Sequence, residues 1–348
     1  ISVMLFNNDW FNFFIQEFFK MIRLLLFFFF SINISSEILE RADIQKFIDM
    51  AVESSDLSRE EIIDYLKDAE PSNRAVQARS NQPEVKATWD DYLSKRVTAR
   101  RIDNGVMFLK EHIEIFDSAE KDFGVSKFYI ASIIGMETNY GSYYGSYNPL
   151  DTIFTRAFEP TSKFWQKELI QLFILSKRYN LNPKKIKSSW SGAIGLGQFI
   201  PSSYNAYGVD YDLNGIVDLL GSKEDGIASV ANYLQANGWL KGETAAIQID
   251  FKGDFTDLNE DQIDELDLPF ELNNFRTKIY AQELKKAGFN FEEEYLSLVS
   301  PILVQQKDLT KLYLGFDNFR VITKYNRSSK YALAVHQLAM EISKKFYE

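Results

Sequence analysis

The stretch SKFYIASIIGMETNYG, residues 126–141, decides how the centre of this chain folds. Residues 126–138 are apolar almost all round, which predicts a helix buried on every side, and Asn139, Tyr140 and Gly141 form a stop signal after it. Glu137 therefore falls in the last turn. Apolar neighbours and the negative end of the helix dipole both disfavour the charged form of its carboxyl group. Such a glutamic acid suits general acid catalysis, and the alternative is a solvent-facing glutamate at a fraying helix end.

The composition limits the class of protein. The chain has 348 residues, 45% of them hydrophobic and 25% charged, so it can bury a large core in one complex domain or a few subdomains. Its net charge of −10, without a basic stripe, argues against nucleic-acid binding. The absence of cysteine excludes disulfides, thiolate nucleophiles and cysteine metal sites. His112 and His336 lie in helical patterns without a second histidine at ligand spacing, which predicts structural roles and disfavours a Ser-His-Asp hydrolase.

The N-terminal residues 1–36 have the pattern of a targeting segment. Arg23 precedes an apolar run, residues 24–30, that has signal-peptide length and is too short to span a membrane. We therefore expect export to the periplasm. Because the chain opens on Ile1, one interpretation makes residues 1–20 an upstream translation artefact. The alternative is a membrane anchor over residues 10–30, although Glu17 and Lys20 interrupt it.

The remaining pattern predicts a mainly helical α+β protein. Residues 42–54 and 58–66 are amphipathic, residues 71–88 read as a linker, and residues 89–105 and 106–123 as two helices. An aromatic loop is expected after Tyr140, followed by helices around 164–179 and 225–237. Strand-like alternation then appears at 246–251, 301–305 and 310–322, with a helix-like stretch at 275–287. A serine at 328 or 329 caps the last helix, with Tyr331, Val335, Leu338 and Ile342 on its apolar face. The predicted units are 37–124 (helical), 125–244 (core), 245–322 (β-rich) and 323–348 (cleft segment and helix).

A glycine-rich segment, residues 189–204, is the second candidate for chemistry. Its glycines would let the backbone approach a ligand closely, while Ser189 and Gln198 offer hydrogen bonds. It lacks both the Gly-Lys-Ser/Thr ending and the preceding strand of a nucleotide-binding loop. The alternative is that the glycines only allow tight helix packing.

An acidic loop, residues 210–218, has the spacing of a calcium site. Asp210, Asp212, Asn214 and Asp218 stand at the first, third, fifth and ninth places of an EF-hand loop, with Gly215 at the sixth and the Ile216 carbonyl at the seventh. The twelfth place is Gly221 where a bidentate glutamate is expected. The closing carboxylate would come from Glu224 or Asp225, and the alternative is a solvated turn.

Aromatic residues follow Glu137 and recur later. Tyr140, Tyr143, Tyr144 and Tyr147 are followed by Tyr233 and the pair Tyr325-Asn326. Aromatic faces beside amide groups suit N-acetylated sugars. Tyrosine and phenylalanine are abundant throughout the chain, however, so composition alone also predicts such clusters.

Together these motifs resemble the lytic murein transglycosylases of the membrane-bound lytic transglycosylase B type, glycoside hydrolase family 103. The resemblance runs from about Phe47 to the end and rests on residues 136–141, 191–204, 229–233 and 318–328. It implies a lysozyme-like helical core, a flanking α subdomain and a small β-rich subdomain. Its carried-over site residues are Glu137 as catalytic acid, Ser189, Gln198, Tyr233, Tyr325 and Asn326 along the saccharide cleft, and Asp210, Asp212, Asn214, Ile216 and Asp225 as the calcium loop.

The resemblance also implies the reaction. Glu137 would protonate the oxygen between N-acetylmuramic acid and N-acetylglucosamine and then take the proton of the muramoyl 6-hydroxyl, which closes into a 1,6-anhydro sugar. Peptidoglycan glycan strands are the implied partner, protein partners stay open, and calcium would be structural, with no cofactor needed for chemistry. Ser162-Lys163 replaces an arginine pair of some members, which leaves stem-peptide contacts open. The missing lipid-bearing cysteine argues against a lipoprotein.

Two other classes remain open at this point. A hydrolytic muramidase would need a second carboxylate across the cleft, and the sequence offers no unambiguous candidate near these motifs. A non-catalytic peptidoglycan-binding protein would keep the tyrosines and Gln198 and could dispense with Glu137.

Overall fold

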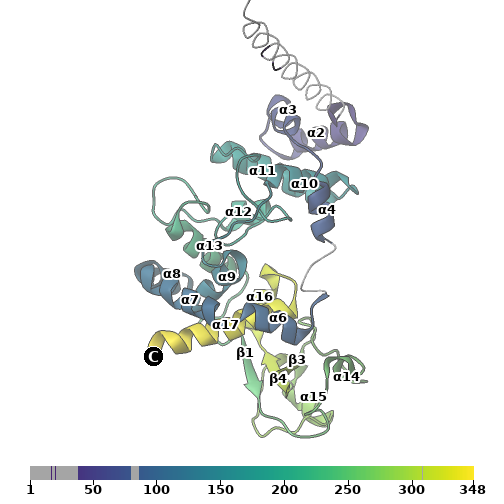
Figure 1. Ribbon diagram of the computed structural model, residues 1–348, viewed down its shortest axis with the longest axis vertical. Helices are drawn as coiled ribbons and strands as arrows, with labels where there is room; N and C mark the ends of the chain where they lie inside the picture. The colour runs from purple at the N-terminus through teal and green to yellow at the C-terminus, as the bar shows by residue number, and fades with distance from the viewer. Residues whose placement is uncertain (1–16, 18–19, 21–37, 80–85, 308) are drawn as a thin grey trace, which may run out of the picture.

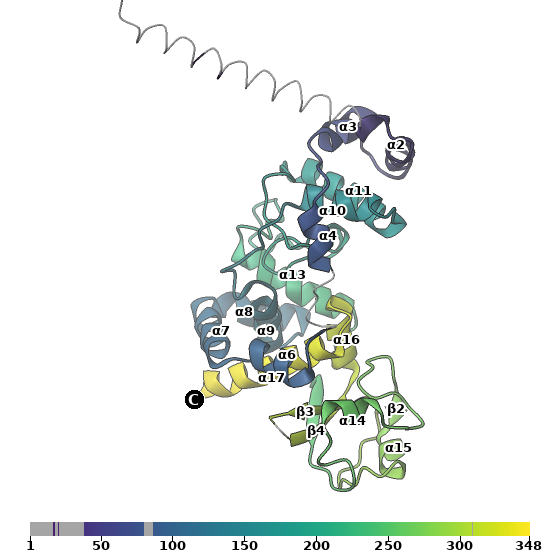
Figure 2. The same cartoon turned by 45° about the vertical axis from the view of Figure 1, so that its right-hand side comes forward.

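The computed structural model describes residues 17, 20, 38–79, 86–307 and 309–348. The molecule is elongated, with one helical group at one end, a second in the middle and a small sheet at the other end (Figure 1). Figure 2 shows the same order from another side. The predicted export or anchor segment lies outside the described residues, apart from Glu17 and Lys20. Among the residues described, no helix is long and apolar enough to cross a membrane.

The first helical group comprises α2 (Ala42–Ser54), α3 (Arg59–Lys67), α4 (Asn73–Arg79), α10 (Pro149–Phe158) and α11 (Lys163–Arg178). Phe47 of α2 meets Phe158 and Phe173 edge to face, with ring centroids 5.5 and 6.4 Å apart. At the start of α3 the predicted capping box is confirmed. Ser58 Oγ accepts the Glu61 backbone N–H at 3.2 Å, and the Glu61 carboxylate accepts that of Ser58 at 2.8 Å.

The second group surrounds the central helix. It comprises α6 (Trp89–Arg96), α7 (Ala99–Glu111), α8 (Ile113–Phe123), α9 (Lys127–Thr138), α12 (Pro201–Tyr207), α13 (Lys223–Ala236), α16 (Asp317–Tyr325) and α17 (Ser329–Tyr347). α9 packs against α7, α8, α13 and α17, and its residues are buried on all sides, as predicted. Ser132 Oγ donates to the Val335 carbonyl at 2.7 Å, which joins α9 to α17. The helices of segment 37–124 thus contribute to both groups.

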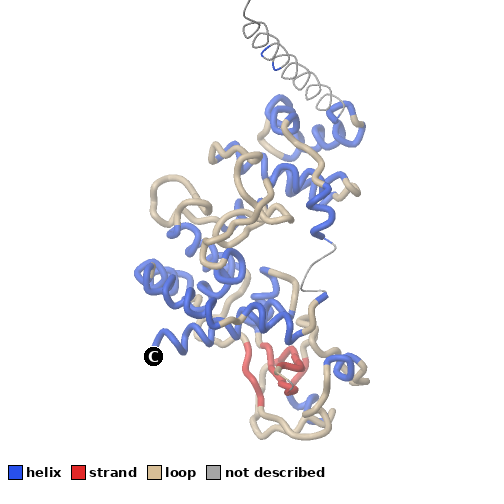
Figure 3. Tube along the Cα trace, in the orientation of Figure 1, coloured by secondary structure: helices blue, strands red, loops and turns tan. Residues whose placement is uncertain are grey.

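A four-stranded antiparallel sheet forms the remaining subdomain (Figure 3). Its strands are β1 (Ala246–Ile249), β2 (Ile279–Tyr280), β3 (Leu298–Gln306) and β4 (Leu309–Gly315), in the order β1-β4-β3-β2, with α14 (Glu260–Asp264) and α15 (Ala281–Lys286) beside them. Leu303 pairs with Leu312, and both belong to a hydrophobic cluster separate from the main core. The mainly helical α+β fold is therefore confirmed, with its own small core under the sheet.

Several predicted helix boundaries are wrong. The helices expected at 89–105 and 106–123 are three, because Thr98 Oγ1 accepts the Arg101 N–H at 3.2 Å and caps a new helix, which then runs unbroken to Glu111. The linker at 71–88 contains α4. The loop expected after Tyr140 is followed by a helix that the sequence did not predict, α10, which begins after its cap residue Asn148.

Two predictions in the β-rich subdomain are also wrong. The strand expected at 310–322 ends at Gly315, and the rest forms α16, because Phe319 and Ile322 are three residues apart and share one buried helix face. The helix expected at 275–287 is reduced to α15 after the two residues of β2.

Candidate active site

Glu137 lies where the backbone turns sharply at the end of α9. Asn139 ends the helix in the left-handed region at φ 48°, followed by Tyr140 at φ 60° and Gly141 at φ 79°. Two consecutive non-glycine residues in this region hold backbone strain, so the surroundings must fix them. The Tyr140 hydroxyl does so by donating to the Arg101 carbonyl at 2.9 Å. The predicted stop signal is confirmed, and it fixes Glu137 in the last turn.

The glycine-rich segment packs directly onto this turn. Thr138 Oγ1 donates to the Leu196 carbonyl at 3.0 Å. The Tyr325 hydroxyl donates to the carbonyl of Gly197, where a Cβ would lie 2.6 Å from that hydroxyl oxygen. A side chain at 197 would therefore push Tyr325 away. The segment brings the end of α9 and the end of α16 together.

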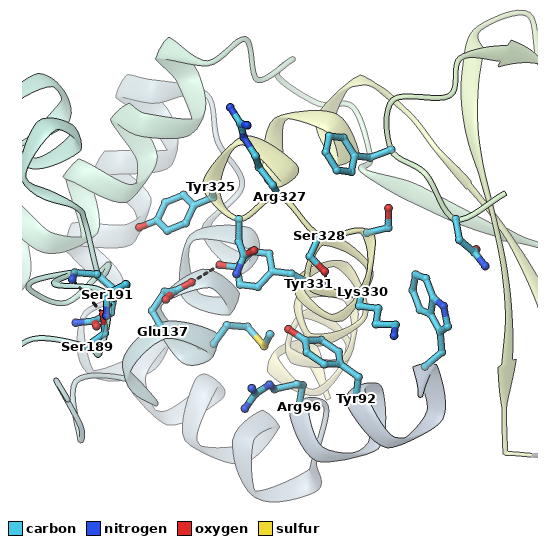
Figure 4. Close-up of a pocket in the computed structure, with 18 of the residues that line it drawn as sticks. Tyr92, Arg96, Glu137, Ser189, Ser191, Tyr325, Arg327, Ser328, Lys330 and Tyr331 are labelled. Atoms are coloured by element: carbon cyan, nitrogen blue, oxygen red, sulfur yellow. Dashed lines mark hydrogen bonds between the residues drawn. The ribbon is translucent and has the colours of Figure 1, made fainter. Parts of the chain in front are cut away.

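Tyr331 contacts the catalytic candidate directly. It lies in the first turn of α17, and its hydroxyl donates to Glu137 Oε1 at 2.6 Å (Figure 4). A hydrogen bond of this length fixes the orientation of the carboxyl group relative to α17. The sequence assigned Tyr331 only to the apolar face of the last helix. The missed signal is that it is the one residue of that face with a hydroxyl group.

A cavity of about 1070 Å³ opens beside Glu137. Four predicted cleft residues line it with Glu137: Ser189, Gln198, Tyr325 and Asn326. In Figure 4, Ser189 lies on one side of Glu137, and Tyr92 and Arg96 lie on the other. The sequence missed several further wall residues, namely Trp89, Tyr92, Arg96, Trp190, Arg327 and Lys330.

The two polar side chains of the glycine-rich segment are held by their own backbone. Ser189 Oγ lies 2.9 Å from Ser191 Oγ and accepts the Ala193 N–H at 3.1 Å. Gln198 adopts φ 51°, and its side-chain N–H donates to the Gly195 carbonyl at 3.0 Å. Both groups are therefore oriented before any ligand binds.

Tyr233, predicted along the cleft, does not line the cavity. It is buried behind Tyr325 with ring centroids 4.7 Å apart, and its hydroxyl donates to the Lys324 carbonyl at 2.7 Å. Tyr233 misses the cavity because it lies on α13, a helix whose residues are mostly buried. Tyr233 packs edge to face against the Tyr325 ring and so supports it.

The tyrosines near Glu137 stay protonated over the physiological range. Burial raises the pKa of Tyr331 well above its usual value, and the charge on Glu137 raises it further. The same two causes raise the pKa of Tyr325. Burial raises the pKa of Tyr233 to about 12. Tyr331 and Tyr325 are therefore lasting hydrogen-bond donors.

Three carboxylates gather at the acidic loop, two from the loop itself and that of Asp225 from the first turn of α13. Oxygen atoms of Asp210, Asp212 and Asp225 all lie within 4.8 Å of one another. Asp225 is fully buried, and it accepts the Tyr211 and Asp218 backbone N–H groups, each at 2.7 Å. Its burial raises its pKa, and the nearby Asp212 charge adds to this. Of the two closing carboxylates considered, Asp225 joins the cluster.

Backbone hydrogen bonds connect this loop to the cavity wall. The Leu196 N–H donates to the Leu219 carbonyl at 2.8 Å, and the Leu219 N–H donates to the Tyr204 hydroxyl at 3.0 Å. Leu219 follows the acidic loop, while Leu196 precedes Gln198 by two residues. The folded loop is thus joined to the glycine-rich segment of the cavity wall.

Both histidines lack metal partners within the described part of the chain. His336 is buried, its Nδ1 lies 2.8 Å from the Tyr129 hydroxyl, and desolvation lowers its pKa to about 4. His112 ends α7 and begins α8. Neither belongs to the one group of possible metal-ligating residues found there.

Comparison with known proteins agrees with the family resemblance of the sequence motifs. The family model described as Transglycosylase SLT domain matches residues 40–340. The chain belongs to this family. A relative, membrane-bound lytic murein transglycosylase B of Escherichia coli (strain K12), is 29% identical over 312 residues, which are 86% of this chain and 82% of that protein.

Solved structures of lytic transglycosylases share the fold. The soluble lytic transglycosylase SltB1 from Pseudomonas aeruginosa matches with a TM-score of 0.75 and 30% identity over 87% of this chain and 99% of that one. The Escherichia coli lytic transglycosylase Slt35 in complex with calcium matches with a TM-score of 0.75 and 29% identity over 89% and 95%. This chain is therefore a lytic transglycosylase that cleaves peptidoglycan glycosidic bonds.

Proposed function

We propose that Glu137 carries both proton transfers of this reaction. It donates a proton to the glycosidic oxygen between N-acetylmuramic acid and N-acetylglucosamine, and the C1–O bond breaks. The carboxylate then removes the proton of the muramoyl 6-hydroxyl, whose oxygen bonds to C1 and gives the 1,6-anhydro product. The observation that carries this proposal is the Glu137 carboxyl group at the cavity wall, held by Tyr331 at 2.6 Å.

Tyr331 has a defined part in this cycle. Its hydroxyl stays protonated and donates to Glu137 Oε1, so it stabilises the carboxylate that remains after the first proton transfer. Since its pKa lies far above that of a carboxyl group, it does not compete for the proton. Tyr331 thus orients Glu137 for both steps.

Ser189, Gln198, Tyr325 and Asn326 are our proposed saccharide contacts. Ser189 and Gln198 lie on one segment and Tyr325 and Asn326 on another, and all four share the cavity of Glu137. Contacts from both segments would hold the muramoyl ring so that its own 6-hydroxyl, and not water, reaches C1. A structurally similar protein, SltB3 from Pseudomonas aeruginosa, has been solved in complex with NAG-NAM-pentapeptide, which supports a peptide-bearing glycan as the substrate here.

Hydrolysis is the second candidate, because the structure supplies carboxylates that the sequence did not indicate. Glu260 and Asp264 of α14 line the same cavity as Glu137. Glu260 Oε2 accepts the Trp89 N–H at 2.9 Å, which ties it to the cavity wall. A hydrolase would need one of them to activate water. Glu260→Gln and Asp264→Asn should leave turnover unchanged, whereas a loss matching that of Glu137→Gln would favour hydrolysis.

We also propose a structural calcium ion in the acidic loop. Asp210, Asp212 and Asp225 fit a hard cation because they present several oxygen atoms to one point. Asn214 and the Ile216 carbonyl would complete the site. The calcium complex of the related Slt35 supports this assignment. The ion would stabilise the folded loop and take no part in bond cleavage.

We place the enzyme outside the cytoplasm, where its substrate lies. The Arg23-led apolar segment supports export, and cell fractionation with N-terminal sequencing tests it. A mature N-terminus between roughly residues 31 and 37 in the periplasmic fraction is expected. An intact Met21 on a membrane-bound product would favour an anchor.

A further inference from the structure

An aromatic and cationic stack lies beside the cavity, formed by Arg156, Trp165 and Trp190. The Arg156 guanidinium carbon lies 3.8 Å from the ring centroid of Trp165 and 4.9 Å from that of Trp190. Trp190 lines the cavity that holds Glu137, whereas Trp165 and Arg156 do not. Of the three side chains, only Trp190 reaches the cavity, and Arg156 joins it to Trp165 outside the cavity lining.

The backbone around Trp190 is held in place by α10. Trp190 and Ser191 are the central residues of a turn in which the Gly192 N–H donates to the Ser189 carbonyl at 3.0 Å. Gly192 adopts φ 83°, and a Cβ there would lie 2.4 Å from the Ile153 side chain. Arg156 follows Ile153 by three residues and lies on the same helix face. One face of α10 thus fixes both the turn and the ring that the turn presents.

Trp190 also has suitable neighbours for a sugar. It stands between Ser189 and Ser191, which Figure 4 shows at the cavity wall beside Glu137. Pyranose rings have apolar C–H faces and polar rims, so they bind where a flat aromatic surface adjoins hydroxyl groups. Arg156 covers one side of the indole ring, which leaves the remaining ring surface for the cavity.

We propose that Trp190 is a saccharide-stacking platform of the glycan cleft and that Arg156 is a positioning residue that holds its ring. The ligand class is a β-1,4-linked N-acetylated glycan, bound through a C–H face of one pyranose ring. A ring fixed before binding loses little side-chain entropy when the sugar arrives. This inference rests on the proposed function of the same cleft and adds a residue that does not take part in proton transfer.

The test measures glycan binding separately from turnover. In the inactive Glu137→Gln background, calorimetry with a β-1,4-linked N-acetylglucosamine oligomer gives the dissociation constant. Trp190→Ala should weaken binding roughly three- to tenfold and Trp190→Phe about twofold, since Phe keeps part of the aromatic face. Tyr143→Ala removes an exposed aromatic ring outside the cavity and is the matched control, with unchanged binding expected.

Arg156→Met tests the positioning role. Arg156→Met should weaken glycan binding in the protein that keeps Trp190. It should have no further effect in Trp190→Ala, because Arg156 acts only by holding the Trp190 ring. In the active enzyme both changes should raise KM more than they lower kcat. Unchanged binding by Trp190→Ala, or an equal effect of Arg156→Met with and without Trp190, would overturn the proposal. Anhydro products from the wild-type protein test the proposed function independently of either result.

Discussion

The end of α9 and the acidic loop both place carboxyl groups among backbone turns, yet they are built for different purposes. At the end of α9, Glu137 lines a large cavity and accepts a hydrogen bond from Tyr331 of α17, a neighbouring helix that is distant only in sequence. At the acidic loop, two aspartates of the loop face Asp225 of α13, which is buried and accepts backbone N–H groups. A carboxyl group at a cavity with one fixed donor can exchange a proton with a substrate, whereas a cluster of carboxylates attracts a cation.

The largest expected effect separates these two regions by chemistry. Glu137→Gln should lower turnover of purified murein by at least about 10²- to 10⁴-fold, because the amide can neither donate nor accept the proton. Its melting temperature should stay near that of the wild type. Asp210→Ala, measured with calcium at a temperature where it is folded, should keep most of its activity. Equal losses of activity in Glu137→Gln and Asp210→Ala would contradict the different roles of the two regions.

Calcium should act on stability alone. At a concentration 100 times its dissociation constant, a bound ion adds about 2.7 kcal/mol to the free energy of unfolding. Melting curves with calcium and with chelator should therefore separate by several degrees, and Asp210→Ala should abolish the difference. Glu224→Gln is the matched control, because its carboxylate stands next to Asp225 and lies outside the cluster, so it should keep the calcium response. Identical wild-type melting curves with calcium and with chelator would show that the loop is a turn that binds no calcium.

Acid unfolding depends on buried His336 as well as on the carboxyl groups of the two regions. Burial lowers its pKa to about 4 from a usual 6.5, so the unfolded chain binds the proton more readily. Its contribution to stability is complete above pH 6.5 and is lost as the pH falls towards 4. Between pH 7 and 5 the wild type should lose about 2 kcal/mol more than His336→Gln in denaturant unfolding. Parallel losses would show that carboxylates alone account for acid sensitivity.

Tyr331→Phe should have the smallest effect of the four. Removing a hydrogen bond to a charged group costs about 1.5 kcal/mol, which is roughly tenfold in kcat/KM. Tyr144→Phe is the control, since its hydroxyl bonds to Lys223 and the ring lies outside the cavity. Steady-state kinetics on soluble muropeptide chains measures both. An unchanged Tyr331→Phe would mean that Glu137 needs no donor from α17.

The sequence predicted the local features of both regions and missed the distant ones. The buried helix, its stop signal and the aspartate spacing are encoded within a few residues each. The contact from Tyr331 to Glu137 joins residues 194 positions apart, so no local pattern reveals it. The pattern predicts a strand at Phe319 and Ile322 because aromatic and β-branched residues favour strands. The same residue types also pack on the buried face of a helix, which is where the structure places them.

Helix α10 shows how a local signal can be present and still be overlooked. Asn148 caps it by accepting the Asp151 N–H at 2.8 Å, and Pro149 occupies its first turn, a common helix start. The surrounding tyrosines and glycines obscured this signal. Without α10 the stack of Arg156 and Trp190 could not be foreseen, because it joins two segments more than thirty residues apart.

The mass of the released muropeptides distinguishes transglycosylation from hydrolysis. Purified murein incubated with the wild-type protein should release muropeptides lighter by one water than those of a hydrolytic muramidase, because the muramoyl 6-hydroxyl takes the place of water at C1. Glu137→Gln should release none of them, while Glu260→Gln and Asp264→Asn should give the same anhydro products as the wild type. Muropeptides with a free reducing end from the wild-type protein, or anhydro products from Glu137→Gln, would contradict the account.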